Sequence, residues 1–190
     1  MILVCGGGHG LGDIPAVIRS LLATSLHCTI VVVCGKNAAL EVAMRALQSS
    51  GNAEGASGPE LRVLGYTNAM HELMAAADLM VGKPGGLTTT EARAVGLPMV
   101  LLQPIPGQEE RNADMLVSLG AAVRAQRTTD AGPAVAAIIG DPVRLRSMRI
   151  AASAAGNPRA AFDVATGISA LLAHGNQCER SDRLLGRPAA

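Results

Sequence analysis

Residues 83–91 read Lys83-Pro84-Gly85-Gly86-Leu87-Thr88-Thr89-Thr90-Glu91. They follow an apolar run over residues 78–82 and lead into a helical pattern that ends at Gly96. The two glycines allow the backbone to turn tightly and to approach a ligand closely, and threonine is a good helix N-cap. This segment therefore predicts a strand, a turn and a helix in direct succession.

The turn admits two interpretations. The first amides of a helix lack intrahelical partners and, together with the helix dipole, they attract anions such as phosphate. Glu91 lies one turn into the helix, where its carboxylate can accept hydrogen bonds from a pair of hydroxyls, as on a ribose. The alternative is a capping box formed by Thr88 and Glu91, which needs no ligand. Local chemistry leaves both interpretations open.

Composition narrows the class of protein. The chain has 190 residues, of which 49% are hydrophobic but only 1% aromatic, so one domain with an aliphatic core is expected. The scarcity of aromatic rings argues against the stacking surfaces that bind single-stranded nucleic acid. A net charge of +1 gives no field that would attract DNA or RNA, so no nucleic-acid partner is predicted.

The cysteines and the apolar stretches of the chain predict a cytoplasmic protein. The four cysteines show no C-x-x-C spacing, and Cys5 and Cys34 fall in predicted buried strands, as expected of reduced thiols. No apolar stretch is long enough to span a bilayer, and the first residues lack the basic start of a signal peptide. The four histidines are scattered, so no metal site is expected.

Short apolar runs alternate with helical patterns along most of the chain. This alternation predicts an α/β fold with an open, doubly wound, mainly parallel and Rossmann-like sheet of six strands. The predicted strands are residues 2–5, 29–34, 61–64, 79–81, 99–102 and 122–124. The predicted helices are residues 14–23, 38–49, 69–77, 89–95, 109–119 and 133–139.

Two further helices, residues 143–155 and 159–173, are expected to pack across the sheet or its edge. Residues 1–174 would then form the domain, and residues 175–190 a polar, frayed C-terminal tail. The first of these helices carries three arginines among apolar residues, at Arg144, Arg146 and Arg149. Such a segment suits contact with an anionic membrane, although a solvated helix face is the more common case.

Ligands of such sheets bind beyond the carboxyl ends of the strands. The Gly-rich loop at residues 6–12 follows the first strand, but its glycines miss the G-x-G-x-x-G spacing and no Gly-Lys-Ser/Thr follows. The second strand ends without the acidic residue that holds an adenosine ribose. NAD and ATP sites are therefore disfavoured. A loop near a diphosphate, with His9 beside it, and a tight turn without a ligand both stay open.

Two other loops at this edge carry candidate groups. Tyr66 follows the third strand, where its ring can cover a flat base or simply mark a strand end. Residues 103–110 leave the fifth strand, and two prolines stiffen this segment before a helix begins. Its amides and carboxylates suit the hydroxyls of a sugar, although Glu109 and Glu110 serve the helix dipole equally well.

The chain resembles the bacterial diacylglycerol glycosyltransferases, which are related to plant monogalactosyldiacylglycerol synthases and to the peptidoglycan N-acetylglucosaminyltransferase. Two motifs carry the resemblance: residues 77–91, which contain the turn quoted above, and Pro104-Ile105-Pro106-Gly107-Gln108-Glu109-Glu110-Arg111-Asn112-Ala113. The resemblance extends from Gly6 to near Ala122. It implies one half of a GT-B fold, namely the C-terminal domain that binds a UDP-sugar donor, and no cofactor beyond that donor.

The resemblance also implies roles for single residues. Glu91 would hold the ribose hydroxyls, and Gly65 and Tyr66 would flank the uracil. Gln108 and Glu109 would contact the donor sugar. The residues near the diphosphate would be Gly86, Leu87, Thr88 and Thr89, with Gly7, Gly8 and His9 nearby. The expected substrate-binding set is completed by Lys83, Gly85 and Asn112.

The function implied is that of the donor-binding portion of an inverting glycosyltransferase, which moves a hexose from a UDP-sugar to a diacylglycerol-type lipid. The relatives' N-terminal domain binds the acceptor and is expected to supply the catalytic base, and it is expected to lie outside this sequence. Without an acceptor domain or subunit, the chain should hold the donor but turn over poorly. Peripheral attachment to the cytoplasmic membrane face is a further expectation.

Other functions remain open. The chain is alternatively a UDP-sugar-binding module without catalysis, or half of a split glycosyltransferase with another acceptor. A sugar-nucleotide epimerase shares the two-domain architecture, but residues 104–110 point to a transferase. A nicotinamide oxidoreductase is weakened by the failed spacing at residues 6–12.

Overall fold

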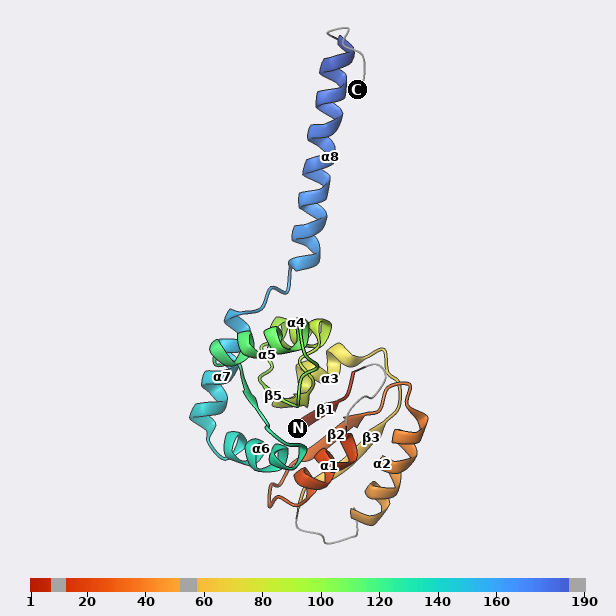
Figure 1. Ribbon diagram of the computed structural model, residues 1–190, viewed down its shortest axis with the longest axis vertical. Helices are drawn as coiled ribbons and strands as arrows, with labels where there is room; N and C mark the ends of the chain where they lie inside the picture. The colour runs from red at the N-terminus through yellow and green to blue at the C-terminus, as the bar shows by residue number, and fades with distance from the viewer. Residues whose placement is uncertain (8–12, 52–57, 185–190) are drawn as a thin grey trace. The chain divides into compact units, whose positions relative to one another are not determined.

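The computed structural model describes residues 1–7, 13–51 and 58–184, with side chains up to residue 173 except at 50 and 51. Two compact units divide the chain, Met1–Gly156 and Asn157–Ala190. The first unit contains a parallel sheet with helices on both faces, and the described part of the second contains one long helix (Figure 1). The division therefore comes earlier in the chain than the predicted boundary at residue 174.

Six strands form one sheet in the order β3-β2-β1-β4-β5-β6, and every neighbouring pair is parallel. The predicted doubly wound α/β architecture is confirmed. The central strands are short and apolar because both faces of the sheet are covered. Each strand agrees with its predicted bounds to within one residue: β1 Ile2–Cys5, β2 Thr29–Val33, β3 Glu60–Leu64, β4 Leu79–Gly82, β5 Met99–Leu101 and β6 Ala122–Arg124.

The helices of the first unit also lie close to their predicted bounds. They are α1 Ile14–Leu22, α2 Ala38–Gly51, α3 Met70–Ala76, α4 Gly86–Ala94, α5 Gln108–Ser118, α6 Ala131–Ile139 and α7 Pro142–Ala154. The largest difference concerns α4, which begins at Gly86 rather than at Thr89. A short 3-10 turn, η1 at Thr128–Asp130, has no counterpart among the predicted elements.

Alternating side chains along β1 divide the core into two layers. Ile2 and Val4 belong to the layer under α1, α2 and α6, whereas Leu3 and Cys5 belong to the layer under α3, α4 and α5 (Figure 1). Helix α7 contributes to both layers, because Met148 packs into the first and the α7 alanines into the second. Helices α3 and α4 therefore share one face of the sheet.

The sheet reverses its winding between β1 and β4, and there the two strands approach each other closely. A Cβ at Gly82, the last residue of β4, would lie 2.7 Å from the carbonyl oxygen of Cys5. Only glycine fits without a shift of the backbone. Open α/β sheets bind ligands beside such a reversal, so this end of β1 and β4 is where a site is expected.

The last helix belongs to the second unit, and its expected packing on the sheet stays a prediction. Helix α8, Ala160–Leu184, is longer than the predicted helix, and its last turns include residues 175–184, which were expected in the polar tail. Every side chain from 161 to 173 is exposed, with Phe162 at 67% and Leu171 at 75%. Among the described residues, no helix combines the length and the apolar character needed to cross a membrane.

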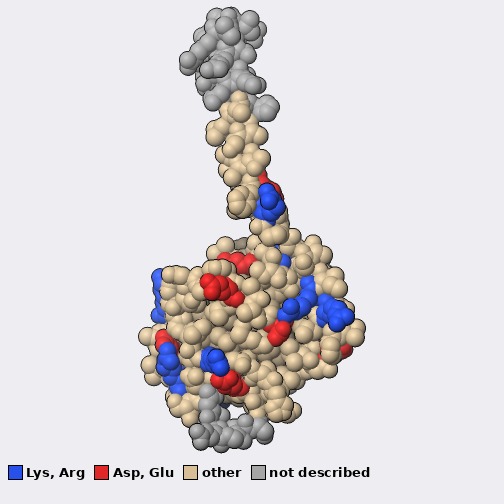
Figure 2. All heavy atoms as spheres, turned by 180° about the vertical axis from the view of Figure 1, so that it is seen from behind, with Lys and Arg blue, Asp and Glu red and all other residues tan. Residues whose placement is uncertain are grey.

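Charged side chains are spread over the surface of the first unit. On the face that Figure 2 shows, Lys and Arg side chains lie beside Asp and Glu in small mixed groups. Among the arginines of α7, Arg149 forms an ion pair: its Nη2 donates to Asp78 Oδ1 at 2.9 Å and to the Ala77 carbonyl at 3.0 Å. Of the three arginines that the sequence places on α7, Arg149 thus has a structural role.

Candidate functional site

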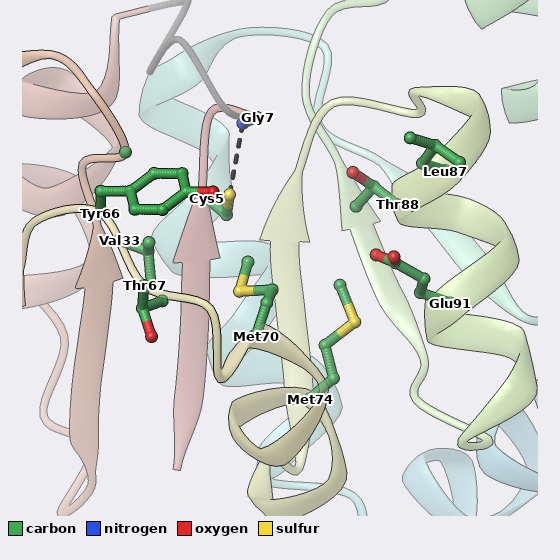
Figure 3. A pocket seen from close by; sticks show the side chains of 11 residues that line it. Cys5, Gly7, Val33, Tyr66, Thr67, Met70, Met74, Leu87, Thr88 and Glu91 are labelled. Carbon is green, nitrogen blue, oxygen red and sulfur yellow. Dashed lines mark hydrogen bonds between the residues drawn. The ribbon is translucent and has the colours of Figure 1, made fainter.

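A cavity of about 360 Å³ lies at the carboxyl ends of β1, β2 and β3, between α3 and α4. It is beside the reversal between β1 and β4, where a ligand site is expected in this topology. Two unlike walls face each other across it, a polar one on α4 and an apolar one from β2, β3 and α3 (Figure 3). Its lining residues are Cys5, Gly7, Val33, Gly35, Tyr66, Thr67, Met70, Met74, Leu87, Thr88 and Glu91.

The polar wall is formed by the first turns of α4. Gly85 is the N-cap, with an extended backbone (φ −66°, ψ 148°), and no described side chain caps the helix that begins at Gly86. Thr88 is therefore the third residue of the helix, and the capping-box interpretation of Thr88 and Glu91 is wrong. The amides of residues 86–88 lie where a helix binds an anion.

Adjacent threonines of this helix have different roles. Thr88 and Glu91 line the cavity from successive turns of α4 (Figure 3). Thr89 is only 2% exposed, its hydroxyl donates to the Gly86 carbonyl at 3.1 Å, and its amide donates to the Gly85 carbonyl at 2.9 Å. Because both donors of Thr89 are used within the turn, its predicted contact with a diphosphate is not supported. Thr89 stabilises the turn instead.

The apolar wall combines side chains from three elements. Val33 ends β2, Tyr66 follows β3, and Met70 and Met74 lie one turn apart on α3. In Figure 3 the Tyr66 ring and the two thioethers lie across the cavity from α4. Sequence reasoning missed the methionines, because a spacing of four residues is also typical of a helix stripe that faces the core. Val33, Thr67, Gly35 and Cys5 were missed as well, and their only signal is their place at or after strand ends.

Cys5 and Gly7 close the cavity at the end of β1. The Gly7 amide donates to the Cys5 sulfur at 3.3 Å, and Gly7 has a φ of 78°. Burial raises the pKa of the Cys5 thiol despite this hydrogen bond, and the Glu91 carboxylate raises it further. Cys5 is therefore a neutral thiol at pH 7 rather than an activated nucleophile. The predicted site residues Gly8 and His9 lie outside the described residues.

Helix α5 supports the turn that starts α4. Asn112 Nδ2 donates to the Pro84 carbonyl at 2.9 Å, which ties the two motifs of the sequence together. A Cβ at Gly86 would lie 3.3 Å from Gln108 Nε2, so the Gln108 amide rests against the N-terminus of α4. Gly107 precedes α5 with a φ of 106°, a conformation that favours glycine.

Like Gly85, Gly86, Thr89, Gln108 and Asn112, three more predicted site residues do not line the cavity, namely Gly65, Lys83 and Glu109. Gly65 faces Glu41, whose carboxylate oxygen would lie 2.5 Å from a Cβ at this position. Lys83 is half-buried in the turn before α4. Glu109 accepts a hydrogen bond from the Ile105 amide at 2.8 Å, which commits one carboxylate oxygen to its own loop. Contacts of these three residues with a ligand stay predictions.

Residues 1–137 match the glycosyltransferase family 28 C-terminal domain, and the match includes every element that lines the cavity. The chain belongs to this family. Among curated relatives of the family 28 chain, the processive diacylglycerol beta-glucosyltransferase of Bacillus pumilus (strain SAFR-032) is 39% identical over 150 residues. The alignment covers 78% of this chain and 37% of the relative, so the chain spans little more than a third of that protein.

Solved structures agree with the fold of the family 28 domain. MurG from Acinetobacter baumannii aligns with a TM-score of 0.70 at 24% identity, over 88% of this chain and 51% of that one. Anabaena Alr3699/HepE, solved in complex with UDP-glucose, aligns with a TM-score of 0.63 at 18% identity, over 91% of this chain and 48% of that one. The domain therefore corresponds to about one half of these GT-B structures, as the sequence resemblance implies.

Proposed function

We propose that this family 28 domain holds the UDP portion of a UDP-sugar in the cavity between α3 and α4. The observation that carries the proposal is that Leu87 and Thr88, from the first turn of α4, line the same cavity as Glu91, while no described side chain caps that turn. A diphosphate needs anion-binding amides, and a ribose needs an acceptor for its hydroxyls. Glu91 lies roughly 7.5 Å along the helix axis from Gly86, which leaves room for a ribose beside the diphosphate.

The apolar wall provides a place for the base. Uracil is flat, and the Tyr66 ring and the thioethers of Met70 and Met74 offer surfaces on which a flat ring can pack. Thr67 also lines the cavity; its Oγ1 accepts a hydrogen bond from the Ala69 amide at 3.0 Å, which leaves the hydroxyl hydrogen to donate to the edge of the base. The donor sugar would then lie toward Gln108, whose amide rests against the first residue of α4.

For the whole protein we propose the transfer of a hexose from a UDP-sugar to a diacylglycerol-type lipid, with inversion. The proposal rests on the relative from Bacillus pumilus, which is named a processive diacylglycerol beta-glucosyltransferase. In this reaction the α4 amides would stabilise the charge that develops on the departing UDP. An acceptor-binding domain or subunit would supply the base for the acceptor hydroxyl and orient it against the donor.

Peripheral contact with an anionic membrane belongs to the same proposal, because a diacylglycerol acceptor resides in a bilayer. Arg144 and Arg146 are exposed on α7, together with Val143 (76%) and Ile150 (64%). Exposed cations beside apolar side chains suit anionic lipid headgroups. Flotation with phosphatidylglycerol vesicles tests this part: the double variant Arg144→Gln/Arg146→Gln should float less. Equal flotation of wild type with neutral vesicles would count against it.

Calorimetry with UDP, UMP, ADP and NADH tests the nucleotide site itself. We expect UDP to bind best and UMP more weakly, because UMP lacks the second phosphate that the α4 amides would meet. Glu91→Gln keeps the size of the side chain and removes its charge, so it should weaken UDP binding without affecting the fold. A preference for NADH would overturn the proposed function.

A further inference from the structure

One cation stands next to the apolar wall of the cavity. Lys36 Nζ lies 5.4 Å from the centre of the Tyr66 ring, within the range of a cation–π interaction. Lys36 follows β2 and Tyr66 follows β3, so the parallel pairing of these strands brings the two residues together. Lys36 is exposed and does not line the cavity, whereas its neighbour Gly35 does. The ammonium therefore contacts a ring that lines the cavity without lining the cavity itself.

The Tyr66 ring is otherwise weakly held. It is 60% exposed, and among the described residues its hydroxyl has no hydrogen-bond partner. A mobile ring loses conformational freedom when a ligand packs against it, and that loss weakens binding. A cation that already fixes the ring in the free protein removes part of this cost.

We propose that Lys36 is a positioning residue for the donor, which holds the Tyr66 ring at the mouth of the cavity so that the ring covers the nucleotide base. The inference rests on the proposed function, since it needs a nucleotide in this cavity. Lys36 acts through the ring and does not touch the ligand. Its contribution is therefore independent of the phosphates, and this separates it from a lysine that binds the diphosphate directly.

Calorimetry of uridine, UMP and UDP with wild type, Lys36→Met and Lys36→Arg tests the proposal. Lys36→Met should lower the affinity for all three ligands by the same factor, about two- to five-fold for an exposed cation–π pair. Lys36→Arg should restore the affinity, because a guanidinium also stacks on aromatic rings.

The possible results distinguish the proposed role of Lys36 from the proposed nucleotide site. A loss that grows from uridine to UDP would assign Lys36 to the phosphates, and unchanged affinity for all three ligands would remove its role. Either result overturns the positioning proposal and leaves the nucleotide site intact. Failure of the wild-type protein to bind UDP would instead overturn the proposed function.

A double-mutant cycle shows whether Lys36 acts through Tyr66. In the Tyr66→Leu background, Lys36→Met should have no further effect on affinity for UMP, whereas in the Tyr66→Phe background it should keep its full effect. The Phe variant is the matched control, because it keeps the ring and removes only the hydroxyl. Additive losses in the Leu background would contradict the proposal.

The composition of the chain permits a direct measurement in the free protein. Lys36 and Lys83 are its only lysines, and Tyr66 is its only tyrosine. Reductive methylation with labelled formaldehyde keeps the charge, and NMR should show the Lys36 methyl signal shifted by the Tyr66 ring current. Lys83 serves as the internal control. The shift should vanish in Tyr66→Leu, and an unshifted Lys36 signal in wild type would overturn the inference.

Discussion

The two walls of the cavity differ in what holds them in place. Glu91 on α4 is exposed and Thr88 half-buried, and neither belongs to the core, whereas Met74 on α3 is 2% exposed and packs within it. The polar wall comes from one continuous stretch of sequence, while the apolar wall is assembled from three elements. The difference indicates that Thr88 and Glu91 are free to serve a ligand, whereas Met74 also maintains the fold.

The largest expected effect separates the walls by stability. Met74→Ala should lower the free energy of unfolding by about 2–5 kcal/mol, because it removes a buried side chain and leaves a cavity. Glu91→Ala should stay within about 0.5 kcal/mol of wild type, as is usual for an exposed position. Urea unfolding of both variants measures the contrast. If Met74→Ala were as stable as Glu91→Ala, the apolar wall would not be part of the core.

The next effect separates the walls by binding. Glu91→Ala should weaken UDP binding about 10- to 150-fold, since hydrogen bonds to a charged group contribute about 1.5–3 kcal/mol. Calorimetry with 2′,3′-dideoxy-UDP is the matched control, because that ligand lacks the hydroxyls proposed to meet Glu91. Wild type and variant should bind it equally. A variant that still prefers UDP over the dideoxy ligand by the wild-type factor would remove the ribose role.

A smaller effect distinguishes two neighbours on the polar wall. Thr89→Val keeps the shape of the side chain but loses the hydrogen bond to the Gly86 carbonyl, so it should destabilise the protein by about 1 kcal/mol. Thr88→Val should leave stability unchanged and weaken UDP binding, because Thr88 lines the cavity. Thermal unfolding and calorimetry of the two variants test the division of roles. The reverse pattern would contradict it.

The smallest effect concerns the support from α5. Asn112→Ala removes the donor to the Pro84 carbonyl and should reduce stability by about 0.5–1 kcal/mol. The looser turn should speed the exchange of the Thr89 amide hydrogen, which is bonded to the Gly85 carbonyl. Asn112→Asp is the control, because a carboxylate keeps the size but cannot donate. If Asp restored wild-type exchange, the hydrogen bond would not be what holds the turn.

Much of the fold could be predicted from the sequence because buried parallel strands are short apolar runs. The apolar run at residues 2–5 coincides with β1, since strands covered on both faces tolerate few polar residues. The start of α4 was misplaced because threonine is a good N-cap in isolation. Here Gly85 takes that position with an extended backbone, and the helix begins before the threonines.

The two walls of the cavity also differ in how far each could be predicted from the sequence. The polar wall could be predicted from residues 83–91 alone, because a helix N-terminus and a carboxylate one turn later are local features of the chain. The apolar wall required the strand order, which puts Tyr66 and α3 beside the end of β1. Met70 and Met74 have the same sequence pattern as any core-facing stripe, so only their position in the folded domain shows that they face a cavity.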